Sequence, residues 1–271
     1  MNFKNLSILE RKQLNSPIIL IGRGGSGTRL LSHLMRHNGL FIGNDINVTE
    51  DSVEWVELLY DLVITSLPLR PDTFGDKWAD KLQEKAANIL SEGKLSADQP
   101  WGWKLPETML ALPEVCHTFT NAKIIHLIRH PISSSLRRTH MTSRLNNPVG
   151  NEVLRRAYKE FGWDFSKAIE HQCYQHNAVS WLYQLTQVRE YAKKHLQPEQ
   201  YLEVRFEDLC NTPATAANNI RMFLDWEELD YECLKIDPAR IKRPQISDPR
   251  IEEINNLCSQ LAYELGYQNK F

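Results

Sequence analysis

The pattern of apolar and polar positions predicts a strand, a tight turn and a helix near the start of the chain. The apolar run Ile18–Ile21 is typical of a buried strand. Asn38 and Gly39 provide a stop for a helix whose apolar positions follow helical spacing, at Leu30, Leu31, Leu34 and Met35. Between the two elements lie glycines at positions 22, 24, 25 and 27, which let the backbone turn tightly.

The same alternation continues along the chain. Short apolar runs predict strands near residues 17–22, 123–128 and 201–205. Helical spacing predicts helices near residues 28–37, 50–65, 78–91, 106–119, 132–140, 166–195, 213–224 and 248–265. Helices that alternate with strands favour an α/β fold built on one mostly parallel sheet. The 271 residues fit a single domain over residues 1–271.

Two segments interrupt this alternation. Residues 141–163, MTSRLNNPVGNEVLRRAYKEFGW, read as irregular, and so does the stretch after Trp226 up to Asp248. Residues 141–163 are the best candidate for a lid or a substrate-binding excursion, with a plain surface loop as the alternative. We also expect substrate-binding excursions of the domain near residues 40–75 and 141–165.

The glycine-rich loop is a candidate anion site, because several N–H groups and the helix N-terminus can point at one phosphate or sulfate. Gly22 and Gly27 fit the phosphate-loop spacing, but Thr28 stands at its lysine position and Arg29 at its Ser/Thr position. The loop is therefore not a Walker loop, which argues against ATP or GTP hydrolysis. Taken alone, an ordinary strand–helix turn is the alternative.

Composition narrows the class of protein. A chain with 42% hydrophobic and 24% charged residues is typical of a globular protein. It has no run of about 18 apolar residues, and MNFKNLSILERKQLN is too polar for a signal peptide, so we expect a cytoplasmic location. A formal net charge of -2 without a basic stripe argues against nucleic-acid binding. Scattered cysteines favour reduced thiols over a metal site, at positions 116, 173, 210, 233 and 258.

A second candidate binding residue follows another apolar run. In residues 122–138, AKIIHLIRHPISSSLRR, a strand delivers Arg129 to its carboxyl end and Pro131 starts a helix. Ligands bind at such strand ends, and an arginine can hold a phosphate with two parallel hydrogen bonds. Hydroxyls of the following turn can add neutral donors. An arginine paired with a surface carboxylate is the alternative.

Together these segments resemble a sulfotransferase. The resemblance rests on the loop with S-G-T, on R-H-P before a serine-bearing helix, and on YLEVRFEDLCNTPATAANNIRMFLDW. WGWKLPETMLALPE at 101–114 and IEEINNLCSQLAYELGY at 251–267 are similar to bacterial members. The resemblance implies transfer of a sulfuryl group from 3′-phosphoadenosine 5′-phosphosulfate (PAPS) to a hydroxyl or amine, with carbohydrate-containing acceptors among those suggested. It also implies a three-layer α/β/α fold with a P-loop kinase-like core.

The resemblance assigns donor-binding roles by position. The loop matches the family's segment for the 5′-phosphosulfate, here Arg23, Gly24, Gly25, Ser26, Gly27, Thr28 and Arg29. The family usually has Arg or Lys where this chain has Gly25, so Arg23 or Arg29 must supply that positive charge. Arg129 matches the arginine that binds the 3′-phosphate. The family's partner serine lies eight residues later, where this chain has Arg137, so either Ser135 or Arg137 takes that role.

Two further basic positions follow from the resemblance. Lys104, in G-W-K-L-P, matches a lysine near the transferred group, where a positive charge would stabilise the leaving phosphate. Arg243 is the preferred contact in the segment that matches the family's loop over the 3′-phosphate. A solvated basic cluster with Arg240 and Lys242 is the alternative.

The group that accepts the proton of the attacking hydroxyl is not singled out. Asp51 and Glu50 should fold back over the open face of the loop, and Asp51 is the preferred candidate. Glu107 and His33 are alternatives, with a helix-capping acid and a partly buried helix histidine as their structural interpretations.

Other interpretations stay open. Glu207 and Asp208 look like a catalytic pair, but we interpret them as structural. A nucleotide kinase of the same fold superfamily lacks support because the Walker lysine is missing. A non-catalytic protein that binds nucleotide or acidic glycan is kept open by Gly25 and the displaced serine. The predicted reaction needs no metal, and its expected partner is a small-molecule or glycan acceptor.

Overall fold

The computed structural model describes residues 8–66, 76–236 and 248–267 of the chain. Within these ranges four strands form one sheet in the order β2-β1-β3-β4, and every pair is parallel. The strands are β1 (Ile18–Ile21), β2 (Gly102–Lys104), β3 (Lys123–Ile128) and β4 (Tyr201–Arg205). The predicted α/β fold with a parallel sheet is confirmed, and the three predicted strands are β1, β3 and β4.

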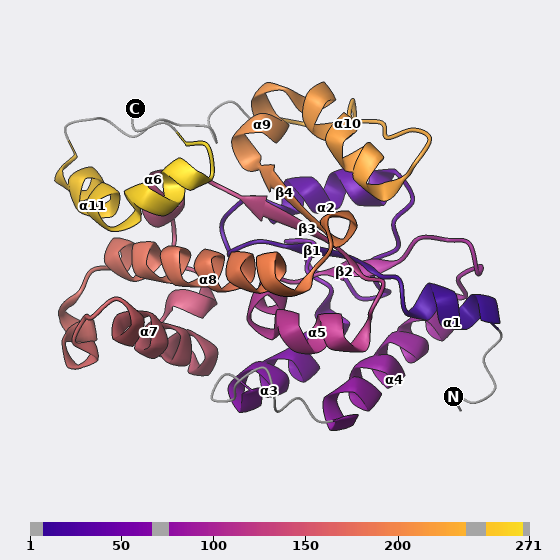
Figure 1. Cartoon of the computed structure of the whole chain (residues 1–271), viewed down its shortest axis with the longest axis horizontal. Helices are drawn as coiled ribbons and strands as arrows, with labels where there is room; N and C mark the ends of the chain where they lie inside the picture. The colour runs from indigo at the N-terminus through magenta and orange to yellow at the C-terminus, as the bar shows by residue number, and fades with distance from the viewer. Residues whose placement is uncertain (1–7, 67–75, 237–247, 268–271) are drawn as a thin grey trace.

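Helices cover both faces of the sheet, as Figure 1 shows. One face carries α2 (Thr28–His37), α9 (Phe206–Asn211) and α10 (Pro213–Leu224). The other carries α3 (Val56–Ser66), α4 (Asp76–Gly93), α5 (Leu112–Thr118) and α8 (Cys173–His195). Alternate residues of β1 pack into the helical layers on the two faces of the sheet. Leu20 lies in the core beneath α2, and Ile19 lies in the core on the opposite face. The molecule is therefore a three-layer α/β/α structure.

The remaining helices extend the layer that contains α8. α7 (Pro148–Glu160) and α11 (Pro249–Glu264) both pack against α8, and α11 also contacts the short α6 (Pro131–Ser135). α1 (Ile8–Leu14) contacts α4 at the opposite end of the molecule (Figure 1). Short 3-10 helices connect these elements: η2 (Val53–Trp55), η4 (Pro106–Ala111), η5 (Met141–Ser143), η6 (Phe165–Glu170) and η7 (Pro198–Gln200).

The carboxyl ends of the parallel strands lie along one edge of the sheet. Leu20 of β1 is in register with Lys104 of β2, so the glycine-rich loop begins beside the end of β2. β3 continues past β1, and its last residue, Ile128, is in register with Arg205 at the end of β4. The loop, Lys104 and the residues that follow β3 and β4 are therefore neighbours.

Residues 141–163 differ from the prediction of an irregular segment, because most of them form η5 and α7. Asn147 caps α7 by accepting a hydrogen bond from Gly150 N at 3.0 Å, and Pro148 occupies the first turn. The buried side chains of α7 follow helical spacing, at Val149, Val153, Leu154 and Ala157. The Asn-Pro sequence marks a helix start here and not a loop.

Several predicted boundaries also change. The helix expected over 132–140 ends at Ser135, and the one expected over 166–195 is divided into η6 and α8. The helix expected over 106–119 consists of η4 followed by α5, and the one near 50–65 begins as η2 at Val53. After Trp226, residues 227–236 form no helix or strand, and the rest of that predicted irregular stretch, residues 237–247, lies outside the described residues.

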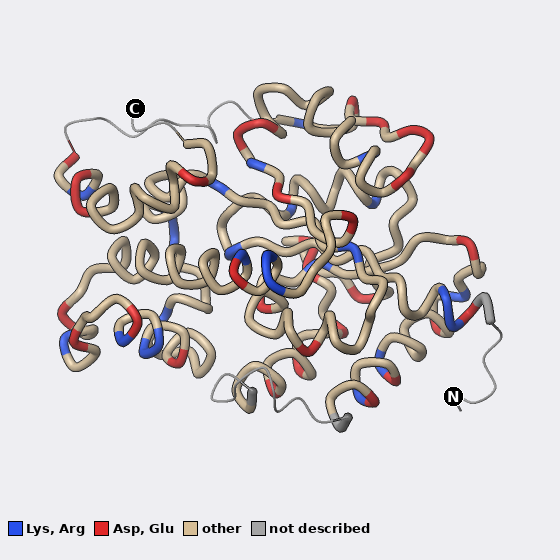
Figure 2. The backbone as a smooth tube through the Cα atoms, in the orientation of Figure 1, with Lys and Arg blue, Asp and Glu red and all other residues tan. Residues whose placement is uncertain are grey.

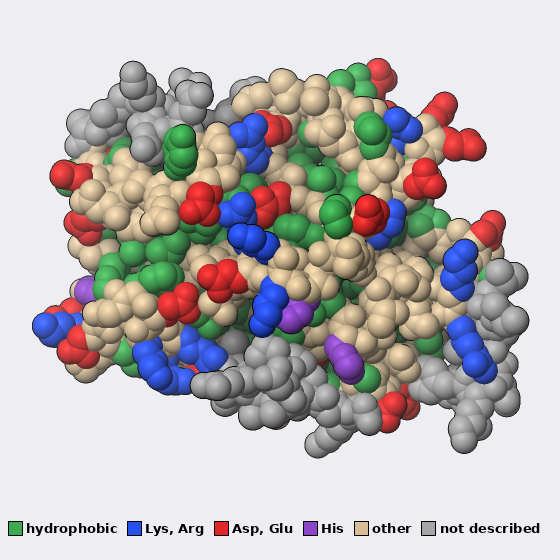
Figure 3. All heavy atoms as spheres, viewed as in Figure 1, with side chains coloured by type: hydrophobic (Ala, Val, Ile, Leu, Met, Phe, Trp, Pro, Cys, Tyr) green, Lys and Arg blue, Asp and Glu red, His purple; other side chains and the backbone are tan. Residues whose placement is uncertain are grey.

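Charged residues of both signs are interspersed along the outer helices, as Figure 2 shows. The face in Figure 3 likewise carries Lys and Arg side chains among Asp and Glu side chains, over a background of hydrophobic and neutral atoms. None of the described helices combines the length and the apolar character that crossing a bilayer requires.

Candidate functional site

The glycine-rich loop runs from the end of β1 to the start of α2 and packs tightly on its neighbours. A Cβ at Gly22 would lie 2.6 Å from the carbonyl oxygen of Leu127 on β3. Gly27 has φ of 95° and caps α2, and a Cβ there would lie 2.4 Å from the ring of Phe206. Only glycine fits these two positions, so the loop holds its backbone N–H groups close to the sheet edge.

Arg23 is the buried positive charge of this loop, with only 1% of its surface exposed. Its Nη2 donates to Asn177 Oδ1 at 2.7 Å and to Ser143 Oγ at 2.9 Å, and its Nη1 donates to Gly24 O at 3.2 Å. Burial lowers the pKa of Arg23 to about 10. No ion pair with a carboxylate is formed by Arg23 in the part of the chain that the structure describes, so its charge is available to an anion at the loop.

Asn177, on α8, connects the loop with the segment after β3. While its Oδ1 accepts from Arg23, its Nδ2 donates to the carbonyl oxygens of Ser135 at 2.9 Å and Arg137 at 3.1 Å. The two segments predicted to bind opposite ends of the donor are therefore tied to one buried amide. No motif pointed to Asn177, since a single asparagine inside a helix has no sequence signature.

Arg129 follows β3 directly and is buried, with 2% of its surface exposed. Its guanidinium carbon lies 4.0 Å from the centre of the Phe206 ring, the ring that also contacts Gly27. Burial, and next the positive charge of Arg137, lower the pKa of Arg129 to about 10. The charges of Arg129 and Arg137 therefore add up at the end of β3.

Ser135 ends the short helix α6 and is fully buried. Its hydroxyl, like that of Ser26 in the loop, makes no hydrogen bond with any of the described residues. Arg137 is exposed two residues later. Arg243, the third predicted contact for the 3′-phosphate, lies outside the described residues.

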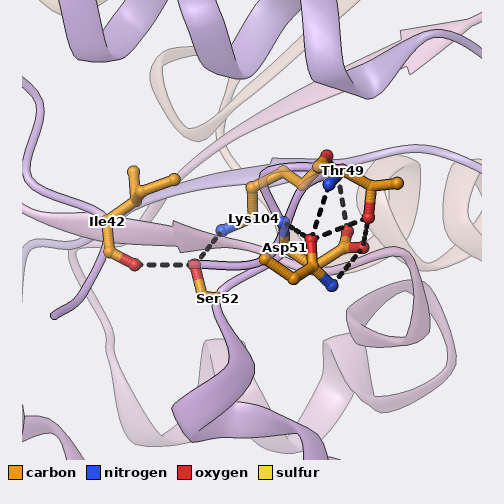
Figure 4. Close-up of polar contacts among 6 residues, drawn as sticks. Ile42, Thr49, Asp51, Ser52 and Lys104 are labelled. Carbon is orange, nitrogen blue, oxygen red and sulfur yellow. Dashed lines mark hydrogen bonds and ion pairs between the residues drawn. The ribbon is translucent and has the colours of Figure 1, made fainter. Parts of the chain in front are cut away.

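Lys104 and Asp51 form an ion pair at the end of β2, shown in Figure 4. Nζ of Lys104 lies 2.6 Å from Asp51 Oδ1 and donates to Thr49 O at 2.8 Å. The backbone is held as well, because Lys104 N donates to Ser52 Oγ at 3.0 Å and that hydroxyl donates to Ile42 O at 2.6 Å. Lys104 has 3% of its side chain exposed, so Asp51 provides most of its charge compensation.

The other oxygen of Asp51 is also engaged. Oδ2 accepts from Asn47 Nδ2 at 3.2 Å and from the hydroxyl of Thr49. The segment before α3 therefore folds over the sheet edge, and it does so through contacts with Lys104.

Two titratable side chains lie beside this ion pair. Glu107, in the turn after β2, accepts a hydrogen bond from the Tyr60 hydroxyl at 3.2 Å, and burial raises its pKa to about 7. His140 packs on the loop, because a Cβ at Gly24 would fall 1.9 Å from its ring. Burial, and next the charge of Arg23, lower the pKa of His140 to about 4. His140 was not singled out from the sequence, and Tyr60 was considered there only as an aromatic residue of an acceptor-binding or core surface.

The remaining candidates lie at the rim or serve packing. Arg29 is exposed in the first turn of α2, and Nδ1 of His33 lies 3.6 Å from Glu50 Oε1 on the same side. Glu207 accepts from His130 N at 3.1 Å and from the Tyr267 hydroxyl at 2.9 Å. These bonds join α9 to the start of α6 and to the end of the described chain, a structural role.

A family model described as Sulfotransferase family matches residues 17–230. The chain therefore belongs to the sulfotransferase family, whose members are PAPS-dependent transferases. The matched residues include the loop, Lys104 and Arg129. No curated protein matches the chain.

Solved structures show the same fold. A sulfotransferase from Alicyclobacillus acidocaldarius shares 16% sequence identity and superposes with a TM-score of 0.52. The match covers 93% of this chain and 96% of the chain of that structure. Sulfotransferase STF9 from Mycobacterium avium shares 12% identity, with coverages of 92% and 76% and a TM-score of 0.50. At these identities the likeness concerns the fold alone.

Proposed function

We propose that the protein transfers the sulfuryl group of PAPS to a hydroxyl or amine of a small-molecule or glycan acceptor. The observation that carries the proposal is the meeting of three features at one edge of the sheet: the glycine-rich loop, the buried Arg129 and the buried Lys104. Ligands of parallel α/β proteins bind at this edge. PAPS carries several negative charges, which these cations would offset.

The loop would hold the 5′-phosphosulfate with its backbone N–H groups and the N-terminus of α2. Arg23 supports this role because its buried charge has only neutral oxygens among its hydrogen-bond partners. The buried Ser26 hydroxyl has its hydrogen-bonding capacity left for a ligand, as far as the described residues go. Arg29, exposed at the start of α2, would add a second positive charge from outside.

The 3′-phosphate would bind at Arg129. The positive charge of Arg137 nearby favours a dianion there over a single negative charge. We keep both predicted partners, Ser135 through its buried hydroxyl and Arg137 through its charge, because Asn177 fixes the backbone of both. Arg243 remains a predicted contact.

Lys104 would offset the charge that develops on the leaving phosphate. Sulfuryl transfer, like phosphoryl transfer, depends mainly on such positioning and charge stabilisation. Asp51, predicted as the proton acceptor, has both oxygens engaged by neighbours, and we therefore assign it first to the positioning of Lys104. The proposal gives no step to a metal ion, and it keeps the expected cytoplasmic location.

A non-catalytic nucleotide-binding protein is the second candidate. Gly25 favours it, because the space around a Cβ at this position is open where relatives usually carry a cation. Turnover distinguishes the two candidates, whereas donor binding is common to both.

Calorimetric titration of 3′-phosphoadenosine 5′-phosphate (PAP) tests the donor site. We expect Arg129→Ala to weaken binding by about 10- to 150-fold, since a charge-assisted hydrogen bond contributes about 1.5–3 kcal/mol. Arg155→Ala, which removes an exposed arginine of α7 paired with Glu152, is the matched control. Equal binding of 5′-AMP and PAP, or an unchanged affinity in Arg129→Ala, would contradict the proposal.

A further inference from the structure

A buried carboxyl group lies beside the proposed catalytic lysine. Glu107 is three residues beyond Lys104, in η4, and has 2% of its surface exposed. Its Oε1 accepts a hydrogen bond from the hydroxyl of Tyr60, a half-buried residue of α3. Burying a carboxyl group costs free energy. Because water does not reach Glu107, another interaction or a function must account for its position.

The charges around Glu107 give it an unusual affinity for protons. The groups that face it are Tyr60 from α3, Asp51 from the loop before η2, and Lys104 from β2. Burial, and to a smaller extent the negative charge of Asp51, raise the pKa of Glu107. A hydrogen bond with its own backbone, the Tyr60 hydrogen bond and Lys104 lower it, and the outcome is about 7. A group with a pKa near neutrality can accept and release a proton under physiological conditions.

Two other neighbours of Lys104 are less suited to accept a proton. Both oxygens of Asp51 accept hydrogen bonds, one of them from Lys104. Nδ1 of His140 forms a hydrogen bond with the Thr142 hydroxyl. Burial of the ring and the charges of Arg23 and Lys104 oppose its protonation. Glu107 is the one of the three whose surroundings favour the protonated form.

We propose that Tyr60 and Glu107 form the proton-accepting pair for the acceptor hydroxyl, with Tyr60 in contact with the acceptor and Glu107 acting through it. This inference rests on the proposed function. Tyr60 is the more exposed of the two, and its hydroxyl already donates a hydrogen bond to Glu107 Oε1 at 3.2 Å. A side-chain hydrogen bond with Asn147, the N-cap of α7, connects Tyr60, in the first segment predicted to bind substrate, with the second such segment.

The proton of the acceptor hydroxyl passes through Tyr60 to Glu107. The acceptor oxygen forms a bond to sulfur, while its proton moves to Tyr60 Oη and the Tyr60 proton moves to Glu107 Oε1. The bond between sulfur and the bridging oxygen of the 5′-phosphate breaks, and its electron pair stays on that oxygen. Lys104 offsets the charge on the leaving group, and PAP departs. Glu107 later returns its proton to solvent.

Proton uptake on donor binding tests the position and titration of Glu107 without an identified acceptor. PAPS is titrated at pH 7 in buffers of different ionisation enthalpy, into wild type, Glu107→Gln and the control Glu92→Gln, which alters an exposed residue of α4. The negative sulfuryl group beside Lys104 should raise the pKa of Glu107. A rise of one unit corresponds to uptake of about 0.4 proton beyond that of Glu107→Gln.

The outcomes separate the two proposals. Absence of PAPS and PAP binding to wild type would overturn the proposed function and, with it, the pair. Binding with equal proton uptake in wild type and Glu107→Gln would overturn the pair alone. Because Gln has the shape of Glu, an unchanged PAP affinity in Glu107→Gln shows that the variant is folded.

Donor cleavage with water as the probe acceptor tests the relay. We expect Glu107→Gln and Tyr60→Phe each to slow the release of PAP from PAPS by about 100-fold, the lower range for general-base catalysis, with PAP affinity unchanged. The kcat/KM of wild type, which reports the free protein, should rise with pH through about 7, and this rise should be absent in Glu107→Gln. Equal rates and equal pH profiles in the three proteins would overturn the relay.

Discussion

Arg23 of the glycine-rich loop donates a hydrogen bond of 2.7 Å to the side chain of Asn177 on α8. The partner is an amide and not a carboxylate, so the hydrogen bond is satisfied while the positive charge of Arg23 stays uncompensated by it. The same amide fixes the backbone of Ser135 and Arg137. One neutral residue thus aligns both halves of the proposed donor site and preserves the charge that would attract the donor.

We predict that two substitutions of Asn177 differ in whether they mainly change PAP affinity or the stability of the fold. Asn177→Asp should pair with Arg23 and weaken PAP binding by about 10-fold or more, because a carboxylate would replace the ligand as counter-charge and would no longer donate to the carbonyl oxygens of Ser135 and Arg137. Asn177→Leu should destabilise the fold by about 1–3 kcal/mol, since it removes one acceptor of the buried Arg23 guanidinium and the donor to the carbonyl oxygens of Ser135 and Arg137. Thermal unfolding and calorimetric titration measure the two quantities. Tighter PAP binding by Asn177→Asp would refute the role given to the uncompensated charge.

Asp51 should contribute to stability as the counter-charge of a buried lysine. Asp51→Asn is expected to destabilise the free protein by about 3 kcal/mol, because it removes the carboxylate partner of Lys104, whose side chain is only 3% exposed. Asp248→Asn, which breaks an exposed pair with Arg250, should change the free energy of unfolding by less than about 1 kcal/mol. Urea unfolding of both variants measures the difference. Equal losses would show that Lys104 does not depend on Asp51.

Gly25 and Gly27 should respond differently to alanine although both have positive φ angles, 92° and 95°. Gly25→Ala should cost about 1 kcal/mol for its backbone conformation alone, because the space around a Cβ is open. Gly27→Ala should cost more and also weaken PAP binding, since its Cβ would meet the Phe206 ring on which Arg129 lies. Thermal unfolding and PAP titration compare the two. Similar losses of affinity would argue against a link between the loop and Arg129 through Phe206.

The parts of the fold that could be predicted from the sequence are those with a strong local signal. β1, β3 and α2 follow from apolar runs and helical spacing next to glycine or proline. β2 was missed because it has only three residues and ends on Lys104, a pattern that reads as a turn. α7 was missed because the residues around its start, Asn146 to Pro148, favour a loop until the buried face of the helix is known.

The candidate site shows the same limit. The position of Arg129 at a strand end could be predicted, because a strand fixes where its last residue lies. Lys104 was found through the family resemblance alone, since the strand that ends on it was missed. The direction of Arg23 could not, since its partner Asn177 is more than 150 residues away and carries no motif. The pairing of Glu107 with Tyr60 likewise depends on how α3 packs against η4, a long-range contact.

The buried carboxyl of Glu107 should make stability depend on pH in a direction opposite to that of most acids. Its pKa is about 7 in the folded protein and lies near 4.5 in the unfolded chain, so the folded state binds more protons between these values. The free energy of unfolding should therefore fall as pH rises from about 4.5 to 7, by on the order of 3 kcal/mol from this group, and stay constant above that range. Glu107→Gln should lack this decrease.

Chemical unfolding of wild type and Glu107→Gln across pH 5 to 8 isolates this group. Histidines with lowered pKa values, among them His130 and His140, change stability in the opposite sense below about pH 6.5, but they are present in both proteins and cancel in the difference. We expect Glu107→Gln to gain stability relative to wild type as pH rises, with the steepest change below pH 7. A difference that is independent of pH would mean that Glu107 is ionised throughout, and a proton acceptor of neutral pKa would have to be sought elsewhere in the site.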